Sequence, residues 1–137
     1  MATVQTEIEI SASPQFVWDA LRDFGALHER LVPGFVVGTE IDADGARVVT
    51  FFNGAVAREI LVGIDDDMRR LAYSVVDGPL GSTHHNASAQ VVDDQRGGSR
   101  FVWTTDVLPD ALAEPTRELM GRGIAIIKET LEAPRHD

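Results

Sequence analysis

The chain has 137 residues, a length that favours a single domain, residues 1–137, with a core that needs no disulfides. Its 22 acidic and 12 basic residues give a formal net charge of −10, which argues against nucleic acids and anionic membranes as partners because both are bound through clustered cations. Cysteine is absent, no basic and apolar leader is visible, and no apolar run is long enough to span a membrane, so we expect a cytoplasmic protein.

The first part of the sequence predicts one strand and two helices. Residues 3–11 alternate apolar and polar side chains, which is typical of a half-buried strand. In the segment "SPQFVWDALRDF", Ser13 can cap a helix that has Pro14 at its first position. Residues 25–35 predict a short second helix that ends at a Pro-Gly pair.

Six further strands are predicted before residue 109, because alternating segments are separated by short polar turns. Successive strands joined in this way form an antiparallel meander. The predicted strands are "FVVGTEI", "ARVVTFF", "VAREILVGI", "LAYSVV", "HHNASAQVV" and "SRFVWTTDVL".

A long helix with a wide apolar stripe is predicted next, and Pro134 ends it. The stripe must be buried against the apolar face of the sheet, which gives an α+β fold of order β-α-α-β6-α. A sheet of about seven strands is wider than one helix can cover. The space between the sheet and the helix is therefore expected either to remain as a cavity or to be filled by large side chains. Gly123 either leaves room for a ligand or packs closely on Trp103 or Phe52. The stripe consists of Leu112, Leu119, Met120, Gly123, Ile124, Ile127 and Leu131.

Two adjacent histidines, His84 and His85, lie on one predicted strand, so their side chains point to opposite faces. Alternation places His85 with Ala87 on the helix-facing side and His84 toward solvent. Neighbouring strand residues cannot converge on one ion, so we predict no metal site, and we expect no cofactor.

The same alternation turns Tyr73 and Trp103 toward the helix. In "AVAREILVGI" each face of the strand carries one charge, Arg58 or Glu59. Periodicity therefore leaves open which of these two side chains points inward.

The sequence resembles the START-like helix-grip superfamily (SRPBCC), and within it the polyketide cyclase/dehydrase-type branch. The similarity is carried by "SASPQFVWDALRDFGALHERLVPG", by "GARVVTFFNGAVAREILVGIDDDMRRLAYSVVDGPLG" and by "GSRFVW". It implies a curved sheet wrapped around the C-terminal helix. Because this superfamily includes cyclases, lipid carriers and hormone receptors, the resemblance defines the fold more narrowly than the function.

The resemblance also implies that Glu59 faces the cavity, together with Tyr73, His85 and Trp103. By the same similarity, the loops "FFNGAV" and "DGPLGST" surround the mouth of the pocket.

We therefore expect the domain to bind a small hydrophobic or aromatic molecule, polyketide-like or lipid-like, between the sheet and the long helix. If Glu59 and His85 both line an apolar cavity, burial raises the pKa of the carboxyl group and lowers the pKa of the imidazole, so that both approach neutral pH. The two residues can then act as the acid and base of a cyclase or dehydratase. Tyr73 can then stabilise a developing oxyanion. The alternatives are a ligand carrier or sensor that catalyses no reaction, and a protein–protein interaction module. We expect the protein to be a monomer or a homodimer. The expected ligand-binding residues are Glu59, Tyr73, His85, Ala87, Trp103, Phe52, Leu31, Met120, Gly123, Ile124 and Ile127.

Overall fold

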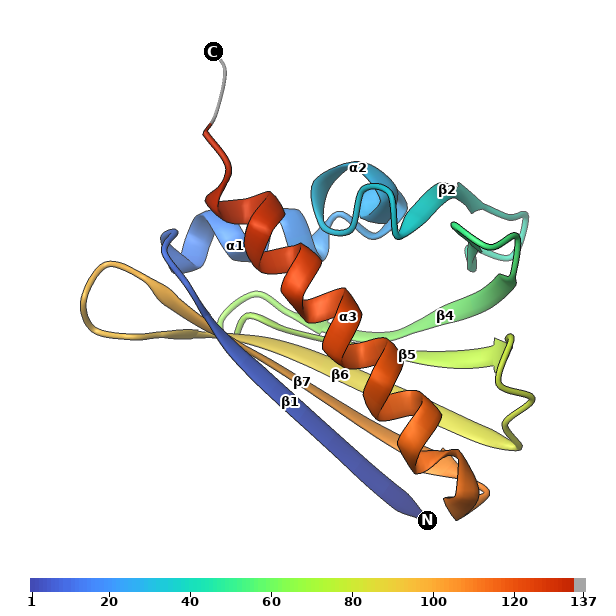
Figure 1. Ribbon diagram of the computed structural model, residues 1–137. Coiled ribbons are helices and arrows are strands. Elements are labelled where there is room, and N and C mark those ends of the chain that lie inside the picture. Colours follow the sequence, from blue (N-terminus) through green and yellow to red (C-terminus); the bar gives the residue numbers. More distant parts are fainter. Residues whose placement is uncertain (135–137) are drawn as a thin grey trace.

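A seven-stranded antiparallel sheet curves around one long helix in the computed structural model of the protein, which describes residues 1–134 (Figure 1). The element order is the predicted one, which confirms the α+β helix-grip fold. The strands are β1 (Ala2–Ile10), β2 (Val36–Ile41), β3 (Arg47–Phe51), β4 (Val56–Asp65), β5 (Arg70–Asp77), β6 (His84–Asp93) and β7 (Ser99–Leu108). The helices are α1 (Pro14–Arg22), α2 (Leu27–Arg30) and α3 (Ala113–Glu132).

Helix α1 begins as its sequence predicts, whereas α2 is shorter than expected. The Ser13 hydroxyl accepts a hydrogen bond from the backbone N–H of Phe16 at 3.2 Å, and Pro14 occupies the first turn. The short second helix predicted within residues 25–35 is present, but it is a single α-helical turn that follows a 3-10 turn at Phe24–Ala26. No side chain caps either segment, and a backbone at Gly34 with φ of 84° turns the chain into β2.

The strand order in the sheet is β1-β7-β6-β5-β4-β3-β2. Strands β2 to β7 therefore form the predicted meander. Strand β1 is the edge strand next to β7 and pairs with it along its whole length, from Ala2↔Val107 to Ile10↔Ser99. Side chains on the concave face of β5 to β7 are buried at alternate positions, as the period-two pattern predicts.

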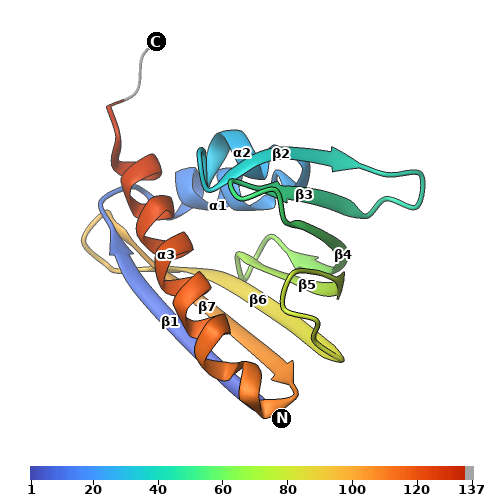
Figure 2. The ribbon, with the colours of Figure 1, turned by 45° about the vertical axis from the view of Figure 1, so that its right-hand side comes forward.

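Strand β4 lies at the bend of the sheet, between the β2–β3 hairpin and strands β5 to β7 (Figure 2). Strand β3 pairs with β4 only from Val56 to Glu59, and beyond Glu59 the pairs of β4 are all with β5. Irregular registers between Arg58 and Glu59 and between Leu61 and Gly63 mark β-bulges, which increase strand bending. The bend carries the β2–β3 hairpin over the concave face and leaves space beneath α3.

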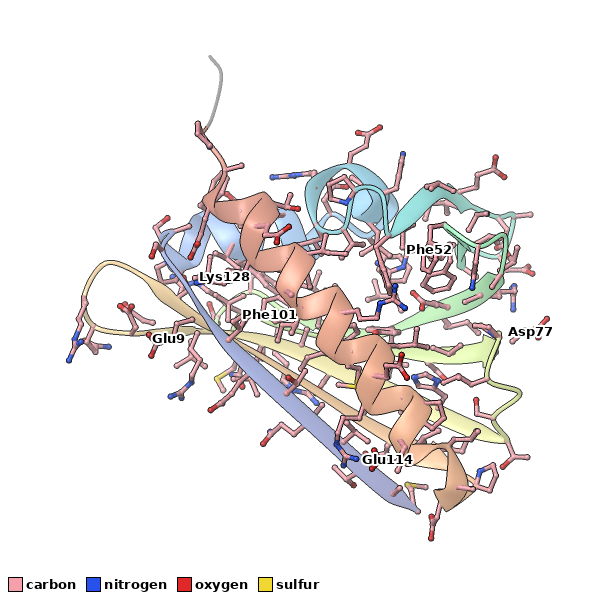
Figure 3. All side chains as sticks on the ribbon, viewed as in Figure 1. Glu9, Phe52, Asp77, Phe101, Glu114 and Lys128 are labelled. Carbon is pink, nitrogen blue, oxygen red and sulfur yellow. The ribbon has the colours of Figure 1, made fainter. Side chains whose placement is uncertain are left out.

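Helix α3 crosses the concave face and is fastened at its C-terminal end to β1 (Figure 3). The Nζ atom of Lys128 donates to the backbone carbonyl of Glu9 at 2.6 Å and to Oε2 of Glu132 at 2.7 Å. The same Glu132 oxygen accepts from the backbone N–H of Ser11 at 2.7 Å. These bonds fix one end of the helix that forms the roof of the cavity described next.

Candidate ligand-binding site

An apolar cavity of about 100 Å³, here called the inner cavity, lies between α3, the concave face of the sheet and the segment that contains α1 and α2. Its polar lining consists of Arg47, Glu59 and Tyr73, with the indole of Trp103 beside them. The remaining lining residues are Leu21, Leu27, Leu31, Val32, Phe35, Val36, Val49, Phe51, Ala89, Phe101, Gly123 and Ile127. The cavity thus offers a hydrophobic space with one small polar end.

A second space of about 280 Å³, here called the outer groove, lies between the β3–β4 turn, the β5–β6 loop and the beginning of α3. Phe51 lines both spaces. Phe52 is 49% exposed in this groove (Figure 3), with its ring 5.8 Å from that of Phe35. The other lining residues are Asn53, Ala55, Pro79, Leu80, Pro115, Glu118 and Leu119. Parts of the two loops that the resemblance places at the pocket mouth therefore line this groove.

A buried ion pair between Arg47 and Glu59 forms the polar end of the inner cavity. The two side chains face each other across β3 and β4 and are 5% and 7% exposed. Nε and Nη2 of Arg47 donate to Oε1 of Glu59 at 2.9 and 2.6 Å, and Nη1 donates to the carbonyl of Phe24 at 3.3 Å. The guanidinium also lies 4.0 Å from the centre of the Phe24 ring. Removal from water makes both charges costly unless they stay paired, so the two residues act as a unit.

Arg47 is the charged residue of the candidate site that the sequence did not predict. The sequence contains a signal for this pairing, because the short turn between β3 and β4 fixes which residues of the two strands lie opposite each other. The backbone N–H of Phe51 bonds to the carbonyl of Ala55 at 2.8 Å, and counting outward from this turn places Arg47 opposite Glu59.

Tyr73 and Trp103 form the second polar contact of the inner cavity. The indole Nε1 of Trp103 donates to the Tyr73 hydroxyl at 3.2 Å. Burial raises the pKa of Tyr73, and the negative charge of Glu59 raises it further. The phenol therefore remains protonated at neutral pH, and its O–H remains a hydrogen-bond donor.

The structure brings together some of the predicted site residues and separates others. Those that line the inner cavity are Glu59, Tyr73, Trp103, Leu31, Gly123 and Ile127, whereas Phe52 lines the outer groove. Ala87, Met120 and Ile124 are buried in the core but do not line the inner cavity.

Gly123 combines the two roles that its position in the stripe left open. It lines the inner cavity, and a Cβ atom at this position would lie 3.2 Å from Cζ3 of Trp103. Close approach of α3 to this indole is therefore the stronger reason for a glycine, because a side chain would displace Trp103.

His85 is not among the residues that line the inner cavity with Glu59, so the acid–base pair stays a prediction. Its side chain is half-buried on the concave parity of β6, yet the β6 residue that lines the inner cavity is Ala89. Four residues of β6, or about 13 Å, separate His85 from Ala89. Across the sheet, His85 lies two strands from Glu59, which pairs with Val75 of β5. Alternation correctly identified the face of the strand, but it carries no information about position along the cavity.

We expect the stability of the protein to fall as the pH drops below about 6.5, partly through His85. Burial, and then the charge of His84, hold the pKa of His85 below its usual value of 6.5. Between the two pKa values the unfolded chain binds more protons than the folded one, so stability is greatest above pH 6.5 and decreases below it. Urea unfolding from pH 7.5 to 5 should show a smaller decrease in the midpoint for His85→Gln than for the unchanged protein. Identical decreases would contradict this role of His85.

The described residues, 1–134, contain no group of three or more histidine, aspartate or glutamate side chains arranged to hold a metal ion. The acidic turn at Asp42 is a hydrogen-bonded turn, in which Oδ1 accepts from the backbone N–H groups of Asp44 and Ala46 at 2.9 and 3.0 Å. Within the same residues, every helix is too short or too polar to cross a lipid bilayer.

The family model described as "Polyketide cyclase / dehydrase and lipid transport" matches residues 1–133. The chain belongs to this family. The match confirms the superfamily resemblance found in the sequence for this polyketide cyclase/dehydrase family member.

Solved structures with low sequence identity share the fold of this family member. The protein XoxI from Bacillus cereus is 22% identical, with 99% of this chain and 100% of that chain covered and a TM-score of 0.87. Norcoclaurine synthase from Thalictrum flavum, solved in complex with dopamine and hydroxybenzaldehyde, is 24% identical over 98% of this chain and 89% of that chain, with a TM-score of 0.71. A START superfamily protein from Mycobacterium smegmatis is 16% identical over 95% and 94% of the two chains, with a TM-score of 0.71. The comparison with curated proteins finds no significant match.

Proposed function

We propose that the domain binds a small, mostly apolar molecule, with one end in the inner cavity and any remainder in the outer groove. The observation that carries this proposal is the inner cavity itself, which is lined by apolar side chains around one buried ion pair. An apolar cavity of about 150 Å³ holds one benzene molecule. A space of about 100 Å³ therefore suits part of a single ring, and a larger ligand must extend past Phe51 into the outer groove.

Binding without acid–base chemistry by Glu59 and His85 is the function that this geometry supports best. Oε1 of Glu59 already accepts two bonds from Arg47, and His85 is not among the residues that line the inner cavity. A proton relay requires both groups within hydrogen-bond reach of one substrate. The domain is therefore proposed to be a carrier or receptor for its ligand.

A cyclase or dehydratase is the second candidate, because Glu59 and Tyr73 both line the inner cavity. A carboxylate can remove a proton and a neutral phenol can stabilise the oxyanion that forms. Mass spectrometry of the molecules that copurify with the protein and its Glu59→Gln variant separates the two candidates. A carrier returns the same molecule from both proteins, whereas an enzyme that depends on Glu59 accumulates unconverted substrate only in the variant.

Filling the inner cavity tests the binding proposal directly. We expect Ala89→Leu to weaken the binding of toluene at least tenfold, because the larger side chain occupies the space that the ligand needs. The matched control is Ala72→Leu, which places the same side chain on the convex face, opposite Ser88 in β6, and should leave the affinity unchanged. Affinities come from calorimetry, and amide chemical shifts locate the bound ligand.

Three results would contradict the proposal: no binding of toluene by the unchanged protein, equal affinities in both alanine variants, or chemical-shift changes confined to the convex face. Circular dichroism of each variant verifies that a loss of binding does not come from a loss of the fold.

A further inference from the structure

We propose that the ligand presents one uncharged hydroxyl group to Glu59 and Tyr73 at the polar end of the inner cavity, on an apolar body that extends from this cavity toward the outer groove. This inference rests on the proposed function and adds the chemical class of the ligand to it.

The first observation is an unused acceptor on a buried carboxylate. Both bonds from Arg47 end on Oε1 of Glu59, and within residues 1–134 no donor forms a hydrogen bond to Oε2. The side chain is more than nine-tenths buried and lines the inner cavity. Glu59 lines the cavity, and a carboxylate oxygen that is open to an apolar space favours a ligand that brings a hydrogen-bond donor.

The second observation is an unused donor on the same face of the sheet. The Tyr73 oxygen accepts from Trp103, but its own O–H reaches no acceptor among the described residues. Tyr73 lies two residues from Val75, the strand partner of Glu59, so the two side chains are diagonal neighbours. A hydroxyl group both donates and accepts, and one such group can satisfy Glu59 and Tyr73 together.

The charge balance of the site favours an uncharged ligand. The Arg47 guanidinium already neutralises Glu59 and donates through all three of its nitrogens to that carboxylate and to the Phe24 carbonyl. A carboxylate on the ligand would meet the lone pairs of Glu59 Oε2. An ammonium group would leave one positive charge unbalanced in a buried apolar space, which is costly.

The test compares four ligands of similar size: phenol, toluene, benzoate and benzylammonium at pH 7. Phenol and toluene differ by a hydroxyl group in place of a methyl group. We expect phenol to bind about tenfold more tightly than toluene, as a hydrogen bond to a charged acceptor gives, and more tightly than either ion. Toluene binding as tightly as phenol would overturn the hydroxyl inference alone, as would tightest binding of benzoate or benzylammonium. Failure of both phenol and toluene to bind would overturn the proposed function with it.

Two variants assign the preference to the two groups. In Tyr73→Phe the ring remains and the donor is lost, and in Glu59→Gln the charged acceptor is lost. We expect the ratio of phenol to toluene affinity to fall at least threefold in each, with toluene itself within twofold of its original affinity in Tyr73→Phe. Because the ratio is measured within one protein, a general loosening of the fold does not change it selectively.

The matched control for these variants is Ser74→Ala, the outward-facing neighbour of Tyr73 on β5, which should keep the original ratio. An unchanged ratio in both Tyr73→Phe and Glu59→Gln would overturn the proposal.

Discussion

Replacing Arg47 with methionine is expected to lower the free energy of unfolding by about 3–5 kcal/mol, because it leaves the Glu59 carboxylate buried without its partner. The arginine contributes more than charge: its guanidinium lies over the Phe24 ring and bonds to the Phe24 carbonyl. Urea unfolding of the variant and of the unchanged protein, at the same pH and ionic strength, measures the difference.

A neighbouring arginine provides the matched control for this prediction. Arg58 lies on the outer face of β4 and pairs with Asp42 and Asp44, both at the edge of the sheet. Water screens these charges, so Arg58→Met should cost much less stability than Arg47→Met. Similar losses in the two variants would contradict the view that burial makes the inner pair important.

The double variant Arg47→Met/Glu59→Leu should regain most of the stability that Arg47→Met loses. Buried ion pairs replaced by apolar side chains of similar size are often as stable as the original pair. A double variant no more stable than Arg47→Met would show that the lost packing on Phe24, and not the unpaired carboxylate, accounts for the cost.

Substituting Trp18 with alanine is the second large effect, with an expected loss of about 3–5 kcal/mol. The side chain is 1% exposed, and its Nε1 donates to Oδ1 of Asp66 in the β4–β5 turn at 2.9 Å. This contact fastens α1, and with it the cavity-lining Leu21, to the far end of the sheet. The same Asp66 oxygen accepts from Arg22 at 2.9 Å, and these two donors hold the pKa of Asp66 below its usual value.

A Trp18→Phe variant separates packing from hydrogen bonding. It keeps most of the buried ring surface and removes only the N–H donor, so it should lose clearly less stability than Trp18→Ala. Thermal or urea unfolding of both variants measures the difference. Equal losses would mean that the bond to Asp66, and not burial of the ring, dominates the effect.

The regular elements could be predicted because each buries one face against a single neighbour. The residues that alternation in β5, β6 and β7 and the apolar stripe of α3 predict to be buried are largely the ones buried in the structure. Strand β4 is different, since one of its two buried positions, Glu59, is charged and the strand beyond it is exposed on both faces. The inward orientation of Glu59 therefore came from the family resemblance, and no periodic pattern could have given it.

The candidate site depends on relations between segments that a linear pattern does not contain. The partnership of Glu59 with Arg47 requires the register of a hairpin, and the absence of His85 from the lining depends on how far along β6 the inner cavity extends. Residues of the β2–β3 hairpin, of the helices and of the sheet together line the inner cavity. Each strand shows which face is buried, but the path of several strands in space fixes which buried residues meet.

The pairing of β1 with β7 has a consequence for the order in which the fold can form. Ala2 lies beside Val107, and α3 packs on β1, so the first strand gains its partners only after most of the chain is available. During synthesis on a ribosome, the backbone N–H and C=O groups of β1 have no partner strand until β7 has been made. Contacts between residues so distant in sequence slow folding, because a long loop has to close before they become favourable. The nascent chain is therefore expected to complete its sheet late, only after β7 has been synthesised.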